Sequence, residues 1–240
     1  METAAGTERL IVPDQPSVRG LDAQEDSGVL TVNPLGSLLR RCVVRIDGDG
    51  EFSGSGFLVA PGEVLTCAHV AHGRDALTGT WGGTSYPAEV SAALPELAED
   101  DPAAGFYPLP DVALLRLIDP PEEHPCVRFD LGEPALGPPA DVLHLAAHTI
   151  GEHQGGTLVA SGAALEYEGP LVEQGFRLFK FKGGQIVGGY SGGPLLNPRT
   201  GGVCALVDSS RGEREDLGGF GVPLSGFLGR IDGLAERERQ

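Results

Sequence analysis

The chain has 240 residues, a formal net charge of −17 and a pI of about 4.6. So acidic a surface repels phosphate backbones and anionic lipid, which argues against a nucleic-acid partner and against membrane binding. No apolar stretch approaches the roughly 20 residues of a membrane span. The 37 Gly and 19 Pro, beside 9 Phe, 4 Tyr and 1 Trp, favour a turn-rich β protein.

The first six residues, METAAG, lack the basic start and apolar run of a signal peptide, so we expect a cytoplasmic protein. The alternative is one domain cut from a longer chain, with any targeting segment elsewhere. The cysteines are widely spaced without a CxxC pair, which favours buried thiols over disulfides in that compartment. They are Cys42, Cys67, Cys126 and Cys204. His144, His148 and His153 fit no established zinc spacing, and we expect no metal and no cofactor.

The pattern of residues divides the chain into three parts. Residues 1–33 mix charges, Pro and Gly without periodicity and are expected to form a flexible lead-in. Residues 34–234 carry the apolar runs of a folded domain, and residues 235–240 are a charged tail. The Pro- and Gly-rich segment 131–140 is the best connection between two halves, 34–130 and 141–234.

Short apolar and β-branched runs separated by turn residues predict strands throughout the domain. These strands are expected at 42–46, 55–60, 64–67, 112–117, 142–147, 157–165, 176–181, 194–196, 203–207 and 220–222. Residues 92–110 are expected to form a long surface loop, and 224–234 a short closing helix. So many short strands with turns between them favour an all-β sandwich or a pair of barrels.

Three local patterns carry the chemistry: LTCAHV at 65–70, DVALLRL at 111–117 and GGYSGGPL at 188–195. Ser191 lies among glycines, whose backbone freedom lets a turn aim successive N–H groups at one point, as a developing oxyanion requires. A serine hydroxyl needs a base, and the base needs a third group that fixes its tautomer. His69 and Asp111 suit these roles because each lies at the edge of an apolar strand. Each pattern alone is also compatible with a structural turn or strand end.

Together the three patterns resemble the signatures of trypsin/chymotrypsin-like serine proteases, of a bacterial, intracellular type. TCAH at 66–69 is similar to their T-A-A-H, DVALL at 111–115 to D-I-A-L-L, and SGGP at 191–194 is their S-G-G-P. The order and separations also match, and the resemblance covers about residues 40–230. It implies two perpendicular six-stranded barrels with the site in the cleft between them.

The resemblance also implies roles. His69 is then the general base and later the general acid, Asp111 orients it, and Ser191 attacks the carbonyl of a polypeptide substrate. The backbone N–H groups of Gly189 and Ser191 form the oxyanion hole. Substrate is expected to contact Gln185, six residues before the nucleophile, and the strand formed by Val207, Asp208 and Ser209.

Two positions depart from the digestive members of the family. Tyr190 stands where they carry the Asp that receives a newly formed N-terminal amine, so activation by that route is not expected. Val70 replaces the Cys that usually follows the catalytic His, so the disulfide beside the base is absent. Both changes resemble bacterial and intracellular branches, including HtrA-like ones.

Other functions remain to be weighed. GYSGG at 189–193 also satisfies the G-x-S-x-G elbow of α/β-hydrolases, but those enzymes place Asp and His after the serine, and the last histidine here is His153. A second alternative is a catalytically silent peptide-binding or regulatory module. A third is a latent protease, switched on by a regulatory partner protein or partner domain. In one form of latency the Gly188–Gly189–Tyr190 turn is flipped in the resting state, so that the Gly189 N–H points away from the cleft.

Overall fold

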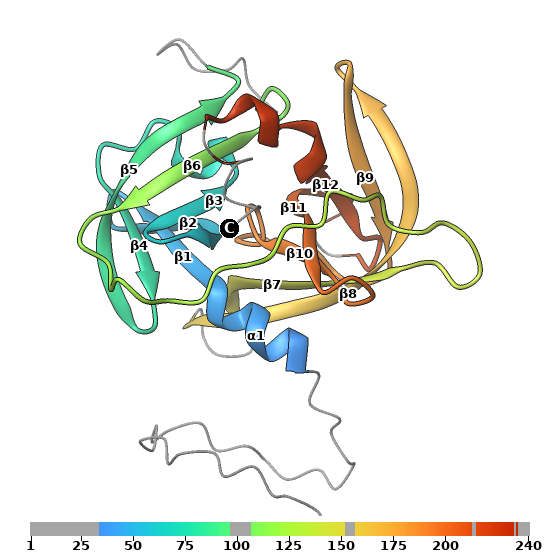
Figure 1. Cartoon of the computed structure of the whole chain (residues 1–240), viewed down its shortest axis with the longest axis horizontal. Coiled ribbons are helices and arrows are strands. Elements are labelled where there is room, and N and C mark those ends of the chain that lie inside the picture. The colour runs from blue at the N-terminus through green and yellow to red at the C-terminus, as the bar shows by residue number, and fades with distance from the viewer. Residues whose placement is uncertain (1–33, 97–106, 152–156, 213–214, 233, 235–240) are drawn as a thin grey trace, which may run out of the picture. The chain divides into compact units, whose positions relative to one another are not determined.

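The computed structural model describes residues 34–96, 107–151, 157–212, 215–232 and 234. Its strands form two six-stranded antiparallel sheets, and each sheet closes into a barrel (Figure 1). The pair of barrels expected from the sequence is therefore confirmed. The lead-in expected at 1–33 and the tail expected at 235–240 lie outside the described residues. No helix in the described part of the chain is long and apolar enough to cross a membrane.

The first barrel closes in the order β1-β2-β3-β6-β5-β4, with β4 paired back to β1. Its strands are β1 (Val43–Gly48), β2 (Glu51–Ala60), β3 (Glu63–Thr66), β4 (Leu77–Trp81), β5 (Thr84–Leu94) and β6 (Val112–Leu117). In β6 every residue except Arg116 is buried, which explains why the sequence there is a continuous apolar run rather than an alternating one.

The second barrel closes in the order β10-β11-β12-β9-β8-β7. Its strands are β7 (Val142–Gly151), β8 (Thr157–Glu173), β9 (Phe176–Lys182), β10 (Pro194–Asn197), β11 (Gly202–Ser210) and β12 (Gly219–Pro223). The strands of the two barrels thus span 43–117 and 142–223, and residues 118–141 connect them.

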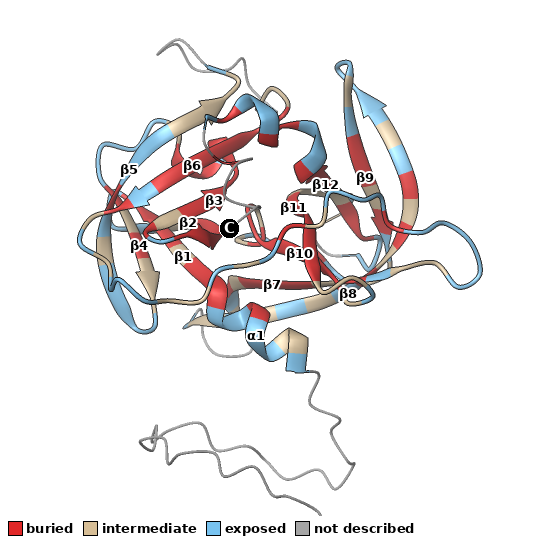
Figure 2. Ribbon diagram, viewed as in Figure 1, coloured by how far each residue is buried: buried red, intermediate tan, exposed pale blue. Residues whose placement is uncertain are grey.

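Apolar side chains fill both barrels, and strands such as β6, β10 and β11 are buried along most of their length (Figure 2). Phe57 and Leu115 are fully buried in the first barrel. In the second, the rings of Tyr167 and Phe179 pack edge to face with centroids 5.2 Å apart. Burying each such side chain contributes roughly 1.5–3 kcal/mol, so these cores hold the strand ends at fixed positions.

The hairpin of β4 and β5 was not predicted, because residues 77–94 mix Thr, Ser, Gly and Pro with few apolar residues. Gly82 and Gly83 connect the two strands, both with positive φ (59° and 82°), which is the backbone of a tight hairpin turn. β5 extends to Leu94, so the expected loop at 92–110 was placed three residues too early.

Helices occupy the two ends of the described domain. Helix α1 (Pro34–Cys42) was not predicted; it begins with a proline, which suits a first helical turn, and Cys42 ends it rather than starting β1. The short helix expected at 224–234 is present as two 3-10 helices, η2 (Leu224–Gly226) and η3 (Leu228–Arg230).

Candidate functional site

His69 and Asp111 meet because their strands are paired. Asp111 directly precedes β6, and His69 lies on the single-turn helix α2 (Ala68–Ala71) that follows β3. Thr66 of β3 pairs with Ala113 of β6, so the two strand ends lie side by side. Asp111 adopts φ 48°, a left-handed conformation that Asp tolerates better than most residues.

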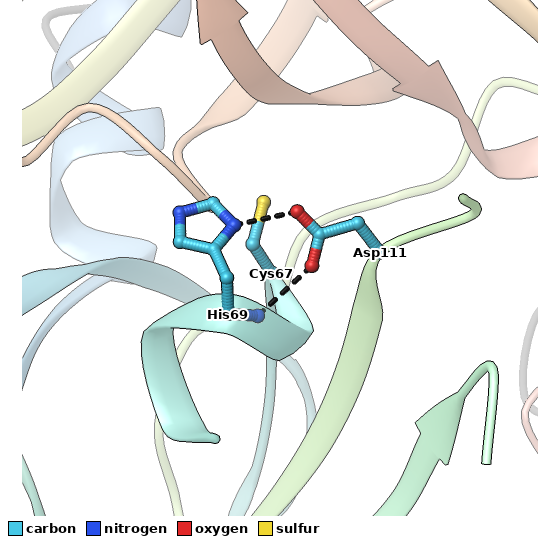
Figure 3. Close-up of side chains that lie close together, drawn as sticks. All are labelled: Cys67, His69 and Asp111. Carbon is cyan, nitrogen blue, oxygen red and sulfur yellow. Dashed lines mark hydrogen bonds and ion pairs between the residues drawn. The ribbon is translucent and has the colours of Figure 1, made fainter. Parts of the chain in front are cut away.

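Two hydrogen bonds join the pair (Figure 3). The backbone N–H of His69 donates to Oδ1 of Asp111 over 2.9 Å, and its Nδ1 lies 2.5 Å from Oδ2. The Asp111 side chain is 3% exposed and the His69 side chain 36%. The carboxyl therefore fixes the ring so that Nδ1 carries the proton and Nε2 is left as the acceptor.

The electrostatics of the pair favour a charged imidazole. Burial by itself lowers the pKa of His69, but the hydrogen bond to Asp111 and the negative charges of Asp111 and Asp208 outweigh it, so the pKa is raised from its ordinary value. A base with a raised pKa that receives a proton in a transition state is stabilised as it does so.

Ser191 lies in the turn before β10, on the second barrel. Its Oγ donates to the backbone carbonyl of Asp208 over 3.2 Å, and its own carbonyl accepts from the N–H of Ser55 on the first barrel. Within the described residues no hydrogen bond joins Ser191 to His69. The structure thus joins the Ser191 turn to β2 of the first barrel, with the hydroxyl directed to the backbone carbonyl of Asp208.

The glycine after Ser191 leaves no room for a side chain. Gly192 has φ +80°, and a Cβ built on it would lie 2.1 Å from the carbonyl oxygen of Ser55 and 2.4 Å from Oγ1 of Thr66. Its N–H donates to the carbonyl of Val207 over 2.8 Å. This close approach requires glycine and sets the position of Ser191.

Hydroxyl groups from both barrels hold the turn of the predicted oxyanion hole. Thr149 on β7 donates to the carbonyl of Gly188, and Ser55 on β2 donates to the carbonyl of Gly189, each over 2.8 Å. In a planar trans peptide the N–H points opposite to the C=O, so the Gly189 N–H points away from Thr149. Among the described residues, neither the Gly189 nor the Ser191 N–H donates to another protein group.

The predicted substrate-binding residues lie in three different settings. Val207 is fully buried; its N–H donates to the Gly193 carbonyl and its carbonyl accepts from Gly192. Asp208 and Ser209 line a cavity of about 390 Å³. The other residues lining it include Tyr107, Leu109, Leu178 and Phe220. Gln185 is exposed and does not line this cavity.

Cys67 is a further residue of the site. It lies within the motif at 65–70, but the sequence did not predict its contact with Val207. Its thiol is buried and donates to the carbonyl of Val207 over 3.2 Å. Burial raises its pKa well above the ordinary value, and the charges of Asp111 and Asp208 add to the effect. Cys67 is therefore a neutral packing group next to the His69–Asp111 pair.

Cys67, His69 and Asp111 have ligand atoms within 4.8 Å of one another, the arrangement of a possible metal site (Figure 3). Nδ1 and Oδ2 are only 2.5 Å apart, whereas two ligands each about 2 Å from a tetrahedral zinc ion lie well over 3 Å apart. The donors therefore fit a hydrogen bond rather than a zinc ion.

The four cysteines are free, as expected. Cys42, Cys67 and Cys204 are buried, whereas Cys126 is exposed, so the expectation of burial was wrong for that one residue. Cys126 lies in the connection between the barrels, where the chain has no strand to cover it.

Solved structures with the same fold support the assignment of the architecture. The Rv3671c protease from M. tuberculosis is similar in its active form (TM-score 0.61, 23% identity, 93% of this chain and 95% of that chain covered). So is an inactive form carrying a serine-to-alanine substitution (TM-score 0.61, 22% identity, 89% and 96% covered). The protease domain of MamO from Magnetospirillum magneticum is also similar (TM-score 0.57, 20% identity, 81% and 98% covered).

None of the curated protein sequences compared with the chain matches it. The family model of the trypsin-like peptidase domain matches residues 54–206, which begin in β2 and end in β11. The match includes all three motifs that gave the resemblance in the sequence. The chain therefore belongs to the family of trypsin-like peptidase domains.

Proposed function

We propose that the protein is a serine endopeptidase that cleaves polypeptides through His69, Asp111 and Ser191. The observation that carries the proposal is the doubly hydrogen-bonded His69–Asp111 pair, which lies at paired strand ends and leaves Nε2 as an acceptor. A histidine held in one tautomer by a buried carboxyl is the arrangement that a general base for a serine requires.

In the proposed reaction, Ser191 Oγ forms a bond to the scissile carbonyl carbon as its proton passes to Nε2 of His69. The N–H groups of Gly189 and Ser191, which are bonded to no other protein group among the described residues, stabilise the oxyanion. The C–N bond then breaks and His69 returns the proton to the leaving amine. Water, with His69 again as base, hydrolyses the acyl-enzyme ester.

The proposed resting state is latent in a specific sense. Ser191 Oγ donates to the Asp208 carbonyl, so the hydroxyl must rotate about its Cα–Cβ bond before it can donate to His69. Catalytic hydrogen bonds are often incomplete in unliganded enzymes and form in the substrate complex. We propose that a bound substrate or a regulatory partner brings about this rotation. The hydrogen-bonded Gly188 and Gly189 carbonyls argue against a flip of the glycine peptide as the switch.

The proposed substrate backbone pairs with β11 beyond Val207. Pairing of β10 with β11 ends at Pro194 and Leu206, whereas β12 continues along β11 to Ser210. One edge of residues 208–210 is therefore unpaired and can accept an extended peptide. Val207, whose backbone groups are bonded within the protein, leaves this role to Asp208 and Ser209. The free thiols fit a reducing compartment, and we place the enzyme in the cytoplasm.

Labelling with a fluorophosphonate probe tests the proposal. Wild-type protein should become covalently labelled, and both Ser191→Ala and His69→Ala should abolish the label. Ser85→Ala is the matched control, because Ser85 is an exposed serine of β5 whose hydroxyl is hydrogen-bonded to that of Thr80, and the labelling of this variant should equal that of wild type. Cleavage of a mixed peptide library, analysed by mass spectrometry, then identifies the residues on each side of the scissile bond.

A well-folded wild type that stays unlabelled, alone and after addition of peptide substrates, contradicts a peptidase that substrate alone can activate. That outcome would favour the alternative of a catalytically silent peptide-binding module. Labelling that survives in Ser191→Ala would show that another nucleophile reacts, and would equally contradict the assigned roles.

A further inference from the structure

A second cavity, apart from the one beside Asp208, is lined by residues of both barrels. Its volume is about 450 Å³. One wall comes from the end of α1, from β1 and from the turn between β4 and β5, and the other comes from β7 and β8. Figure 1 shows α1 beside β7. None of the three candidate catalytic residues lines this cavity, and its size is that of a site for a small organic molecule.

Positive charge is concentrated at this cavity. Arg40, Arg41 and Arg45 line it, and no Asp or Glu is among the described residues that do so. The chain as a whole has the opposite balance, with 34 acidic and 17 basic side chains. Basic residues are favoured in the last turn of a helix, where Arg40 and Arg41 lie. Arg45 lies on β1, so the basic group extends beyond the helix end.

The three guanidinium groups retain donors for a ligand. Arg45 bonds to one carboxylate oxygen of Asp47, through Nε over 2.7 Å and through Nη2 over 2.6 Å, which leaves its Nη1 group unused. In the described part of the chain, no ion pair or hydrogen bond engages the side chain of Arg40 or Arg41. An arginine fork binds a carboxylate or a phosphate through two parallel hydrogen bonds, so this cluster suits either group.

The rest of the wall suits the body of an organic anion. Trp81, Leu158 and Ala160 provide apolar surface. The indole N–H of Trp81 donates to the backbone carbonyl of Arg41 over 2.6 Å, which fixes the ring beside the basic cluster. His148 also lines the cavity, and its Nδ1 is buried without a hydrogen-bond partner among the described residues. Buried polar atoms normally have a partner, and a polar atom of a ligand can provide one here.

We propose that this cavity binds a small organic anion, whose carboxylate or phosphate group is held by Arg40, Arg41 and Arg45 and whose body packs against Trp81. The site lies outside the proposed peptidase machinery and does not depend on that function. A local basic cavity also agrees with the exclusion of nucleic acid, because its positive charge is confined to a space of about 450 Å³ in an acidic chain.

Trp81 makes the proposal measurable, because it is the one tryptophan of the chain and it lines the cavity. The fluorescence of the full-length protein is titrated with phenyl phosphate and with benzoate at constant ionic strength. Benzyl alcohol provides a similar aromatic body without the charge. We expect a saturable change in emission with at least one of the two anions, with a dissociation constant of about 1 mM or below. Saturation by phenyl phosphate alone identifies a phosphate site, by benzoate alone a carboxylate site, and by both a site for either group.

Arg41→Gln tests the basic cluster, because it removes one charge and keeps the backbone carbonyl that holds Trp81. It should weaken binding of the anion about tenfold or more, the effect of losing a charge-assisted hydrogen bond. Arg40→Gln should act in the same direction and is the second variant if the first does not fold. Arg230→Gln is the matched control: it removes the same charge at an exposed residue of η3 outside the cavity and should bind as wild type does.

Three results would overturn the proposal. They are no saturable change with either anion in wild type, equal binding by wild type and both cavity variants, and equally strong saturation by benzyl alcohol, which would make the cavity an apolar site. Anion binding by a protein that fluorophosphonate never labels would support the site and count only against the proposed peptidase function.

Discussion

The hydroxyl oxygens of Tyr190 and Ser161 lie 2.6 Å apart and share a hydrogen bond. Tyr190 directly precedes Ser191 and is 4% exposed, and Ser161 belongs to β8. Tyr190 is thus attached to β8 of the second barrel by a hydrogen bond between two hydroxyl groups. This explains how the turn is fixed in a chain that lacks an acid at this position.

Replacing Tyr190 by Phe should loosen this turn. The change removes the phenol oxygen and leaves the Ser161 hydroxyl without that partner, at a cost of about 1 kcal/mol. If this hydrogen bond stabilises the reactive arrangement of the turn, its loss should slow fluorophosphonate labelling about fivefold, because about 1 kcal/mol corresponds to that factor in rate. Ser161→Ala should slow it similarly, and the double variant no further, because both remove one interaction. Unchanged labelling in both single variants would assign the hydroxyl pair no part in fixing the turn.

Gly192→Ala should be far more damaging than a glycine substitution elsewhere. Its Cβ would overlap the Ser55 carbonyl and the Thr66 hydroxyl, and neither atom can withdraw because both belong to strands of the first barrel. We expect a loss of several kcal/mol in the free energy of unfolding, the range of overpacked and strained sites. Urea titration measures it.

The matched control is Gly201→Ala. Gly201 has nearly the same φ, +72°, but nothing lies within 4 Å of the new Cβ. The free energy of unfolding of Gly201→Ala should fall only by the strain of an alanine in the left-handed conformation, roughly 1–2 kcal/mol. Equal losses of stability at the two positions would mean that backbone conformation alone, and not the contact between the barrels, makes glycine necessary at position 192.

The sequence was sufficient for the strands that are buried on both faces. β6 and the buried end of β2 are continuous apolar runs, so their position follows from composition alone. β4 and β5 lack such a run because much of their surface is exposed, and only the barrel closure between β1 and β4 reveals them. Helix α1 has nine residues with an early glycine, too short for a periodic signal.

In the site, too, some residues have a local sequence signal and others depend on contacts distant in sequence. His69, Asp111 and Ser191 lie in local motifs that can be read directly. The hydroxyl of Ser55 that supports Gly189 lies 134 residues away in sequence, and no local pattern connects such partners.

The thiols should differ sharply in reactivity. Burial raises the pKa of Cys42 to about 11 and that of Cys67 well above its ordinary value, and the thiolate is the reactive form. Cys126 is exposed, although partial burial raises its pKa as well. Iodoacetamide at pH 8 should therefore modify Cys126 alone in the native protein and all four thiols in urea, as counted by mass spectrometry. Native alkylation of Cys67 would show that the buried space around its thiol, next to the His69–Asp111 pair, opens to solvent.

Asp141 should make the protein more stable above pH 4 than below it. It lies just before β7 and accepts hydrogen bonds from Arg199, Asn197 and the N–H of Ala135, joining the connection between the barrels to the end of β10. The bond to Arg199 is the largest influence on its pKa, which falls to about 2, although burial opposes the change.

The sign follows from where the proton binds. Between the ordinary pKa of 3.8 and about 2, the unfolded chain binds a proton at this residue and the folded protein does not, so stability falls as pH falls. The advantage of wild type over Asp141→Asn in urea unfolding should be full at pH 6 and shrink from pH 4 downwards. Glu89→Gln, at an exposed ion pair with Arg116, should differ little from wild type at either pH. If the difference in unfolding free energy between wild type and Asp141→Asn stays constant from pH 6 to 3, Asp141 acts through its shape and hydrogen bonds rather than through its charge.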